Sequence, residues 1–342
     1  MPDATPAVRP AVGVRLRFEG RAYDCGVGET ALTALLRQGA DIPYSCRKGV
    51  CLTCLMRAVE GAPPADSQKG LKETWRAQGC FLPCLCRPDA DFGIARADDA
   101  AVFGRARVID IVPLAGNVRR VRLEPATPLY YRPGQFVNLR RADGLIRSYS
   151  LASVPRLDPL LELHVKRLPG GQMSNWVFDR LAPGEAVDLQ GPHGSCFYVP
   201  GRPEQPMLLI GNGTGLAPLV GVLRDALHDG HRGPIRLYHG SRHPEGLYLA
   251  AELRALAAAH PNVAYLACVS GPGARAPGCR PARAEEAAFG DLPRLSGWRV
   301  FLCGYPPMVH AARQRAYLAG ASLDDIEADP FELRELRRTP RG

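Results

Sequence analysis

The spacing of apolar residues changes twice along the chain and divides it into three segments. In the first, apolar and polar residues alternate from Val12 to Asp24, as in a β-hairpin, and residues 29–38 follow the period of a short amphipathic helix. This pattern predicts a small α+β domain over residues 1–95. Residues 96–103 are small and polar, which is typical of a linker.

The second segment, residues 104–200, consists of short runs rich in Val and Leu that are interrupted by Pro and Gly turns. Strands and turns spaced in this way indicate a β-barrel or sandwich. In the third segment, residues 201–342, strand-like apolar runs alternate with helical patterns. That alternation predicts an α/β layer with a parallel sheet. The expected strands are 207–210, 235–238, 263–269 and 300–303.

Composition narrows the class of protein without identifying it. With 342 residues, 46% hydrophobic and 23% charged, the chain is long enough for two or three globular domains. Apolar runs stay short of a membrane span and residues 1–14 lack a signal-peptide pattern, so we expect a cytoplasmic protein with no membrane partner. The net charge of +9 comes from basic residues that stand singly or in pairs, so nucleic-acid binding is not expected. We expect a monomer.

Four cysteines carry the most specific pattern in the chain. Three follow the spacing Cys-x4-Cys-x2-Cys, and twenty-nine residues separate the third from the fourth; they are Cys46, Cys51, Cys54 and Cys84. That spacing is typical of a plant-type 2Fe-2S cluster. Gly49 suits such a loop, because a residue without Cβ allows positive φ and lets backbone N–H groups approach the cluster sulfurs.

Two alternatives stay open for these cysteines. A structural zinc site also takes four thiolates, but such sites usually pair two Cys-x2-Cys knuckles, and only one stands at the right place. The identity of the fourth ligand is open as well, because Cys80 and Cys86 lie within four residues of Cys84.

The second segment contains groups that could hold a flavin nucleotide. Arg147 begins an Arg-x-Tyr-Ser sequence with Tyr149 and Ser150, and Gly171 and Ser174 stand at the expected start of a helix. A helix start offers free backbone N–H groups and the positive end of the helix dipole to a phosphate. These groups together supply a guanidinium, a flat ring, a hydroxyl and an anion nest.

The third segment carries two motifs at the ends of expected strands. Gly211, Gly213, Thr214 and Gly215 follow an apolar strand and precede a helix, where a backbone turns sharply to approach a pyrophosphate. Cys303 ends a later strand and is followed by Gly-Tyr-Pro-Pro-Met. Tight packing alone could explain either motif, but ligands bind such sheets at the carboxyl ends of the strands.

All of these motifs fall in the order of one family. From Val14 to Phe331 the chain resembles the ferredoxin–NAD(P) reductase superfamily, specifically its members with a fused N-terminal plant-type ferredoxin domain, the reductase components of multicomponent bacterial oxygenases. The resemblance implies a β-grasp ferredoxin domain, an antiparallel β-barrel FAD domain and an α/β NAD(P) domain. It implies that Arg147 contacts the flavin pyrophosphate, Tyr149 lies against the isoalloxazine, and Ser150 hydrogen-bonds near flavin N5.

The resemblance also assigns roles on the nucleotide side. Gly171 and Ser174 match the phosphate-binding loop, and residues 211–218 match the nicotinamide-nucleotide loop. Cys303 would lie beside the nicotinamide C4 atom, and Phe331 would cover the flavin.

The closing strand of plant-type ferredoxins carries a Leu-x-Cys unit, and this match selects Cys84 as the fourth ligand and leaves Cys80 and Cys86 as spare thiols. The chain departs from the family at Leu52 and Asn212, where many relatives have glycine. At Leu52 we expect the hydrogen bonding or the exposure of the cluster to differ from that in relatives. At Asn212 the change is tolerated if φ is positive, because Asn adopts that conformation.

The implied reaction moves a hydride from NADH or NADPH to FAD, and single electrons from FAD through the 2Fe-2S cluster to a terminal oxygenase. We favour NADH, although Arg242 could hold a 2′-phosphate. Arg47 and Lys48 flank the cluster, so the acceptor protein is expected to present carboxylates.

Two other functions remain. A reductase of this architecture could serve an enzyme that deoxygenates nucleotide-linked sugars, or the chain could be a non-catalytic redox sensor with a degenerate flavin site. The preserved Arg147, Tyr149, Ser150 and Cys303 argue against the sensor. The charged tail over residues 332–342 is expected to be mobile.

Overall fold

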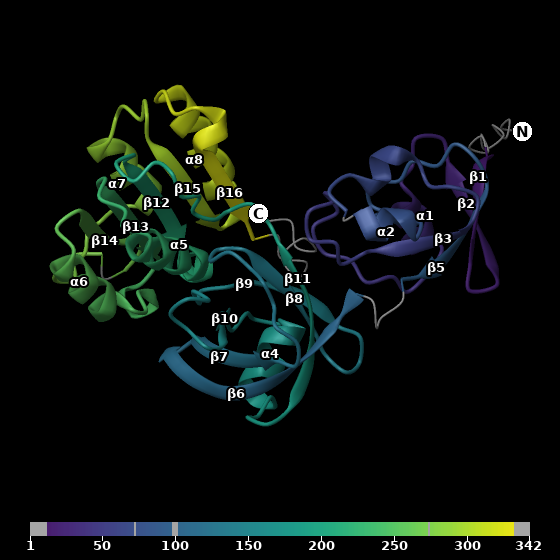
Figure 1. Cartoon of the computed structure of the whole chain (residues 1–342), viewed down its shortest axis with the longest axis horizontal. Helices are drawn as coiled ribbons and strands as arrows, with labels where there is room; N and C mark the ends of the chain where they lie inside the picture. Colours follow the sequence, from purple (N-terminus) through teal and green to yellow (C-terminus); the bar gives the residue numbers. More distant parts are fainter. Residues whose placement is uncertain (1–11, 72, 98–101, 273, 332–342) are drawn as a thin grey trace, which may run out of the picture. The chain divides into compact units, whose positions relative to one another are not determined.

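A computed structural model describes residues 12–71, 73–97, 102–272 and 274–331 (Figure 1). The chain forms two compact units, Met1–Phe103 and Gly104–Gly342. The tail over residues 332–342 and the middle of the expected linker lie outside the described residues.

The first unit is an α+β fold around a mixed five-stranded sheet with strand order β2-β1-β5-β3-β4. Its strands are β1 (Val12–Phe18), β2 (Arg21–Gly26), β3 (Met56–Glu60), β4 (Cys80–Phe81) and β5 (Phe92–Arg96). Only β1 and β5 pair in parallel. Its helices are α1 (Ala31–Arg37), η1 (Ala65–Gln68) and α2 (Glu73–Ala77). Thr30 caps α1 through its side chain, and Leu32 and Leu35 of this helix join Leu16 and Phe18 of β1 in the core.

The second unit begins with an antiparallel sheet of six strands in the order β10-β7-β6-β11-β8-β9. They are β6 (Gly104–Ala115), β7 (Val118–Pro125), β8 (Phe136–Arg140), β9 (Ile146–Ser150), β10 (Leu161–Lys166) and β11 (Ala186–His193). An antiparallel bridge between Leu151 and Leu163 joins the two edge strands and closes the sheet, which we call the barrel. Helix α4 (Gln172–Asp179) buries Met173 and Val177 against the barrel core.

The rest of the second unit, which we call the parallel-sheet domain, has a five-stranded parallel sheet in the order β14-β13-β12-β15-β16. Its strands are β12 (Met207–Asn212), β13 (Ile235–Ser241), β14 (Val263–Val269), β15 (Arg299–Gly304) and β16 (Ile326–Pro330). The helices are η2 (Gly213–Gly215), α5 (Leu216–His228), η3 (Pro244–Gly246), α6 (Ala250–Ala259), α7 (Ala284–Asp291), α8 (Pro306–Leu318) and η4 (Leu323–Asp325).

The parallel-sheet domain has a core on each face of its sheet. Helices α5 and α6 contribute to one core cluster, and α7 and α8 contribute to the other. The predicted α+β, antiparallel and parallel-sheet classes are confirmed. The sequence patterns missed α7 and α8, whose apolar residues follow no clear helical period, and β16, which has only five residues.

The strand order of the parallel sheet reverses between β12 and β15, which lie side by side with Gly211 opposite Cys303. Chain connections leave these two strands in opposite directions, and ligands bind such sheets at this switch point. We call the place at the carboxyl ends of β12 and β15 the crevice. The glycine loop (residues 211–215) and the turn after Cys303 both lie at this crevice.

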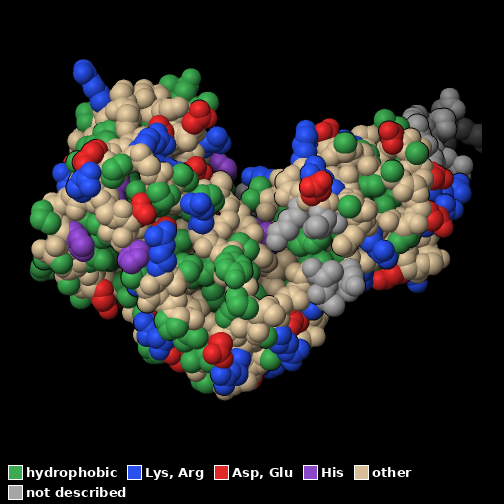
Figure 2. Space-filling model, in the orientation of Figure 1, with side chains coloured by type: hydrophobic (Ala, Val, Ile, Leu, Met, Phe, Trp, Pro, Cys, Tyr) green, Lys and Arg blue, Asp and Glu red, His purple; other side chains and the backbone are tan. Residues whose placement is uncertain are grey.

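Among the described residues, helices are too short or too polar to span a bilayer. On the face drawn in Figure 2, basic and acidic side chains are interspersed instead of gathering in a basic stripe.

Candidate functional site

The cysteine loop, residues 44–54, turns through three left-handed residues. Arg47, Gly49 and Leu52 have φ values of 56°, 77° and 54°. A Cβ on Gly49 would lie 2.4 Å from Cδ1 of Leu85 and would displace that side chain, and the positive φ itself favours glycine there. At Leu52 the backbone is left-handed, a conformation that glycine adopts freely and that leucine takes at a conformational cost.

The thiols of the cysteine loop meet in two pairs. Backbone N–H groups of Lys48 and Cys51 donate to Cys46 Sγ at 3.3 Å, and the N–H of Cys46 donates to Cys51 Sγ at 3.3 Å. The hydrogen bond from the Cys51 thiol, helped by these N–H groups, lowers the pKa of Cys46 to about 5. In the second pair, a hydrogen bond from the Cys54 thiol lowers the pKa of Cys84.

Two thiol pairs fit a cluster of two irons better than a single metal ion. Each iron of a four-cysteine 2Fe-2S cluster takes two protein thiolates, and the N–H groups that surround Cys46 and Cys51 are those that stabilise thiolate ligands. Cys86 hydrogen-bonds to Ser67, and Cys80 lies on β4 in the core of the first unit.

The crevice brings together residues that are distant in sequence. Ser150 Oγ at the end of β9 donates to Asp329 Oδ2 of β16 at 3.3 Å, and Asp329 stands opposite Cys303 in the strand register. Asp329 is half-buried, but its carboxyl is enclosed by protein, and this desolvation raises its pKa to about 6. The sequence motifs pointed to Ser150 and Cys303 but missed Asp329.

Cys303 itself is fully buried, and its Sγ lies 3.3 Å from Sγ of Cys196. Burial raises the pKa of the Cys303 thiol, which therefore stays protonated at neutral pH. Phe331 follows β16 and donates its N–H to the Gly304 carbonyl at 2.7 Å, which places it at the same crevice.

The glycine loop needs glycine because its backbone closely approaches the backbone at the end of β15. A Cβ on Gly215 would lie 2.2 Å from the Cys303 carbonyl oxygen, and Gly213 has a left-handed φ of 52°. Asn212 has an extended φ of −123°, so the positive φ considered for it is not needed. Instead, its side-chain Oδ1 accepts from the Tyr305 N–H at 2.8 Å and ties the two loops of the crevice together.

Lys166 is a second residue that the motifs missed. Its Nζ lies 3.5 Å from the place where a Cβ of Gly213 would stand, directly beside the glycine loop. The residue keeps solvent access, yet the surrounding protein lowers the pKa of its ammonium group. A cation at the start of a helix adds to the attraction of that site for a phosphate.

The expected flavin-side residues lie on the barrel. Arg147 and Tyr149 stand on β9, where Arg147 Nη1 donates to the Ile146 carbonyl at 2.7 Å. Gly171 is the N-cap of α4, and Ser174 in its first turn accepts from the Leu168 N–H at 3.1 Å. Ser174 thereby closes the loop in front of α4, whose first N–H groups remain directed out of the helix.

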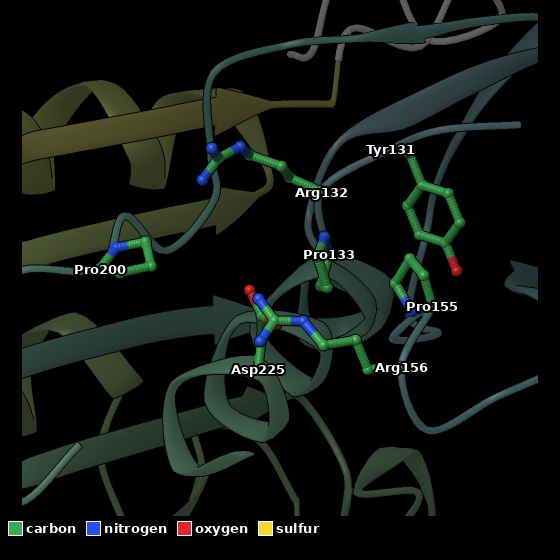
Figure 3. Close-up of a pocket in the computed structure, with 7 residues that line it drawn as sticks. All are labelled: Tyr131, Arg132, Pro133, Pro155, Arg156, Pro200 and Asp225. Carbon is green, nitrogen blue, oxygen red and sulfur yellow. The ribbon is translucent and has the colours of Figure 1, made fainter. Parts of the chain in front are cut away.

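A cavity of about 290 Å³ lies elsewhere in the second unit (Figure 3). Its walls are Tyr131, Arg132, Pro133, Pro155, Arg156, Pro200 and Asp225. None of these residues belongs to the sites expected from the sequence, and Arg156 reaches over Asp225 inside it.

Family models match three parts of the chain. Residues 15–89 match a 2Fe-2S iron-sulfur cluster binding domain, residues 105–198 an oxidoreductase FAD-binding domain, and residues 209–314 an oxidoreductase NAD-binding domain.

Individual relatives match over most of their length. The reductase subunit of an aromatic O-demethylase from Amycolatopsis sp. is 38% identical over 85% of this chain and 90% of its own. A reductase component of naphthalene 1,2-dioxygenase/salicylate 5-hydroxylase systems from Ralstonia sp. is 34% identical over 89% of this chain and 94% of its own. The crystal structure of an Amycolatopsis cytochrome P450 reductase matches with a TM-score of 0.66 and 36% identity, over 93% of this chain and 98% of that one.

The fold, the crevice and these matches define an NAD(P)H-dependent flavin and iron–sulfur oxidoreductase. Its cofactors are a 2Fe-2S cluster, FAD and a nicotinamide nucleotide. The chain belongs to the ferredoxin–NAD(P) reductase superfamily, among the members that carry an N-terminal 2Fe-2S domain and act as reductase components.

Proposed function

We propose that this chain takes electrons preferentially from NADH and delivers them to the oxygenase component of a multicomponent system. The observation that carries the proposal is the meeting of Ser150, Asp329 and Cys303 beside the glycine loop at one crevice. The relatives that are named as reductase components of O-demethylase and dioxygenase systems support the choice of acceptor. We further propose a monomeric, cytoplasmic protein.

In the first unit, Cys46, Cys51, Cys54 and Cys84 are the proposed cluster ligands. The bound cluster supplies one-electron chemistry, and the chain's own part is to hold the thiolates and to donate hydrogen bonds to them. The two thiol pairs and the low pKa of Cys46, about 5, support this assignment. Cys80 and Cys86 are then structural thiols.

On the barrel, Arg147, Tyr149, Gly171 and Ser174 are the proposed flavin-binding residues. FAD, when bound, converts a two-electron donor into single electrons. The N-terminal N–H groups of α4 and the Arg147 guanidinium are suited to its pyrophosphate. Tyr149 offers a half-buried ring beside them.

At the crevice, Ser150 and Asp329 form a hydroxyl–carboxyl pair that can hold a proton near neutral pH, because the pKa of Asp329 is about 6. The neutral, fully buried thiol of Cys303 keeps water out beside this pair, and Phe331 is the proposed cover for the flavin. These residues orient the reacting groups and keep the site dry, which is what hydride transfer requires of the protein.

For the nucleotide, the glycine loop with Gly211, Gly213, Thr214 and Gly215 is the proposed pyrophosphate site, and Lys166 supplies a positive charge beside it. Arg242 follows β13 and is exposed, so solvent would weaken its attraction for a 2′-phosphate. We therefore keep NADH as the preferred donor.

The surface around the cysteine loop suits an acidic acceptor. The Arg47 guanidinium stacks over the Tyr44 ring at 4.5 Å, Lys48 follows, and the nearby Val50 is 55% exposed. Such a surface combines positive charge with a small apolar contact, which favours a partner that presents carboxylates around an apolar spot.

An anaerobic titration tests the proposal. The purified protein is titrated with NADH and then with NADPH while the flavin and iron–sulfur absorption bands are recorded. We expect NADH to bleach both chromophores at lower concentration than NADPH. A cluster spectrum without flavin, or flavin that neither nucleotide bleaches, would overturn the proposed function.

A further inference from the structure

Strand β10 has two faces with different neighbours. Leu161, Leu163 and Val165 belong to the barrel core. Glu162, His164 and Lys166 alternate with them and therefore point out of the barrel. On that side His164 contacts Tyr248, and the Lys166 side chain reaches the glycine loop. The outer face of β10 therefore packs against the parallel-sheet domain.

His164 stands at the centre of a buried hydrogen-bond chain. Its Nε2 lies 2.9 Å from Glu162 Oε1, and its Nδ1 lies 3.1 Å from the hydroxyl of Tyr248. A carboxylate only accepts, so Nε2 carries the hydrogen, and in the neutral ring Nδ1 accepts from Tyr248. The His164 side chain is 0% exposed and Tyr248 is 3% exposed, so the bond between them is shielded from water, whereas the Glu162 side chain is 20% exposed.

The contact lies directly behind the glycine loop. Tyr248 packs edge-on against the ring of His239, with centroids 5.7 Å apart and an interplanar angle of 84°. His239 is fully buried and stands opposite Gly211 in the register of β12 and β13. Tyr248 therefore packs between the barrel and β13, the strand next to the one that leads into the glycine loop.

We propose that His164 is a positioning residue, whose bond to Tyr248 sets the register of the parallel-sheet domain on the barrel. Apolar surfaces tolerate small slides, but a buried hydrogen bond is directional and fixes the relative position of its partners. Ser150 belongs to the barrel and Cys303 to the parallel-sheet domain, so this register sets the hydride distance. The inference rests on the proposed roles of these two residues.

The same domain provides a matched control. His239 Nδ1 lies 3.1 Å from the hydroxyl of Tyr265, which repeats the His164–Tyr248 geometry between β13 and β14, within the parallel-sheet domain. Tyr248→Phe and Tyr265→Phe each remove one hydroxyl from a histidine Nδ1. Only the first breaks a bond between the barrel and the parallel-sheet domain. Tyr265 is half-buried, so the thermal midpoint of each variant is measured as well.

The test is stopped-flow reduction of the FAD-loaded protein by NADH without oxygen, which separates the limiting rate from the Kd. We expect Tyr248→Phe to lower the limiting rate about tenfold with little change in Kd, since sub-ångström misplacement has effects of that order. Tyr265→Phe should stay within about twofold of the wild type. His164→Asn, which offers an amide near the position of Nδ1, should recover more of the rate than His164→Ala.

Equal limiting rates for Tyr248→Phe and Tyr265→Phe would overturn the positioning role and leave the proposed function intact. Equal rates for His164→Asn and His164→Ala would also overturn it. A wild-type protein whose flavin neither nucleotide reduces would overturn the proposed function, and this inference with it.

Discussion

The residues that form the cysteine loop are close together in sequence, whereas those that form the crevice are far apart in sequence. In the cysteine loop, backbone N–H groups donate to sulfurs two and five residues away. In the crevice, Ser150 and Asp329 are 179 residues apart, and Cys196 and Cys303 are 107 apart. The first site depends on the conformation of one loop, whereas the second depends on how the barrel and the parallel-sheet domain pack.

Because of this difference, substitutions at the two sites should affect different numbers of properties. A change in the cysteine loop should remove one cofactor and leave the second unit unaffected. A change in the contacts that join the barrel to the parallel-sheet domain should alter flavin reduction and stability together, whereas loss of a group that only touches the nucleotide should alter binding alone. Four variants test this contrast.

The largest effect is expected for Cys84→Ala. Loss of one thiolate leaves an iron without a full ligand set, so the cluster absorption and electron delivery to an acceptor protein should disappear. Flavin reduction by NADH should stay near the wild-type rate, because the flavin and nucleotide sites lie in the other unit. Absorption spectra and stopped-flow flavin reduction measure the two effects separately.

Cys86→Ala is the control for this experiment, since Cys86 is buried two residues away and hydrogen-bonds to Ser67. It should keep the cluster. If Cys86→Ala lost the cluster while Cys84→Ala kept it, the ligand assignment would be wrong.

In the crevice, Asp329→Asn should change how stability depends on pH. Enclosure raises the pKa of Asp329 in the fold from 3.8 to about 6, so the folded state binds this proton more tightly than the unfolded chain. That contribution to stability is complete below about pH 4 and is lost as the pH rises through 6. Asparagine is neutral throughout, so the variant should be more stable than the wild type by roughly 2 kcal/mol at pH 8.

The thermal release of flavin, followed by fluorescence, measures this difference at pH 5 and pH 8. The gap between variant and wild type should widen with pH. Asp324→Asn, at an exposed position in η4, should show no such trend. A gap that narrows with pH would contradict the raised pKa of Asp329.

Lys166→Gln should act on nucleotide binding. Removing a charge-assisted contact to a pyrophosphate should raise the Kd for NADH about tenfold and leave the limiting rate of flavin reduction almost unchanged. Arg167→Gln is the control, because Arg167 is exposed and already paired with Asp179 at 2.8 Å. An unchanged Kd in Lys166→Gln would remove Lys166 from the site.

The contrast between the two sites also explains what the sequence could reveal. The cysteine spacing, the glycine loop and the order of the domains are local patterns, and each predicted its element or cofactor class. Asp329 could not be found in this way, because its role depends on Ser150, which only the packing of β16 beside the barrel brings near.

Lys166 illustrates a second limit. The alternation along β10 shows that Glu162, His164 and Lys166 share a face, but not that the parallel-sheet domain covers this face. The chain conformation at Asn212 is a third case, since the sequence allowed a positive φ and the bond to Tyr305 fixes an extended one.

The smallest effect is expected at the proposed acceptor surface. Arg47→Glu combined with Lys48→Glu should slow electron delivery to an acidic acceptor about fivefold at low salt, since exposed charges steer association but add little to the chemistry. Near 0.5 M salt the difference should almost vanish, because the Debye length falls to about 4 Å. The double change Arg15→Glu and Arg17→Glu on β1 alters the charge equally and should have less effect. If the cluster spectrum is unchanged in both variants, the charge acts on the encounter with the acceptor protein. If the slower electron delivery persists at high salt, these residues belong to the cluster site itself.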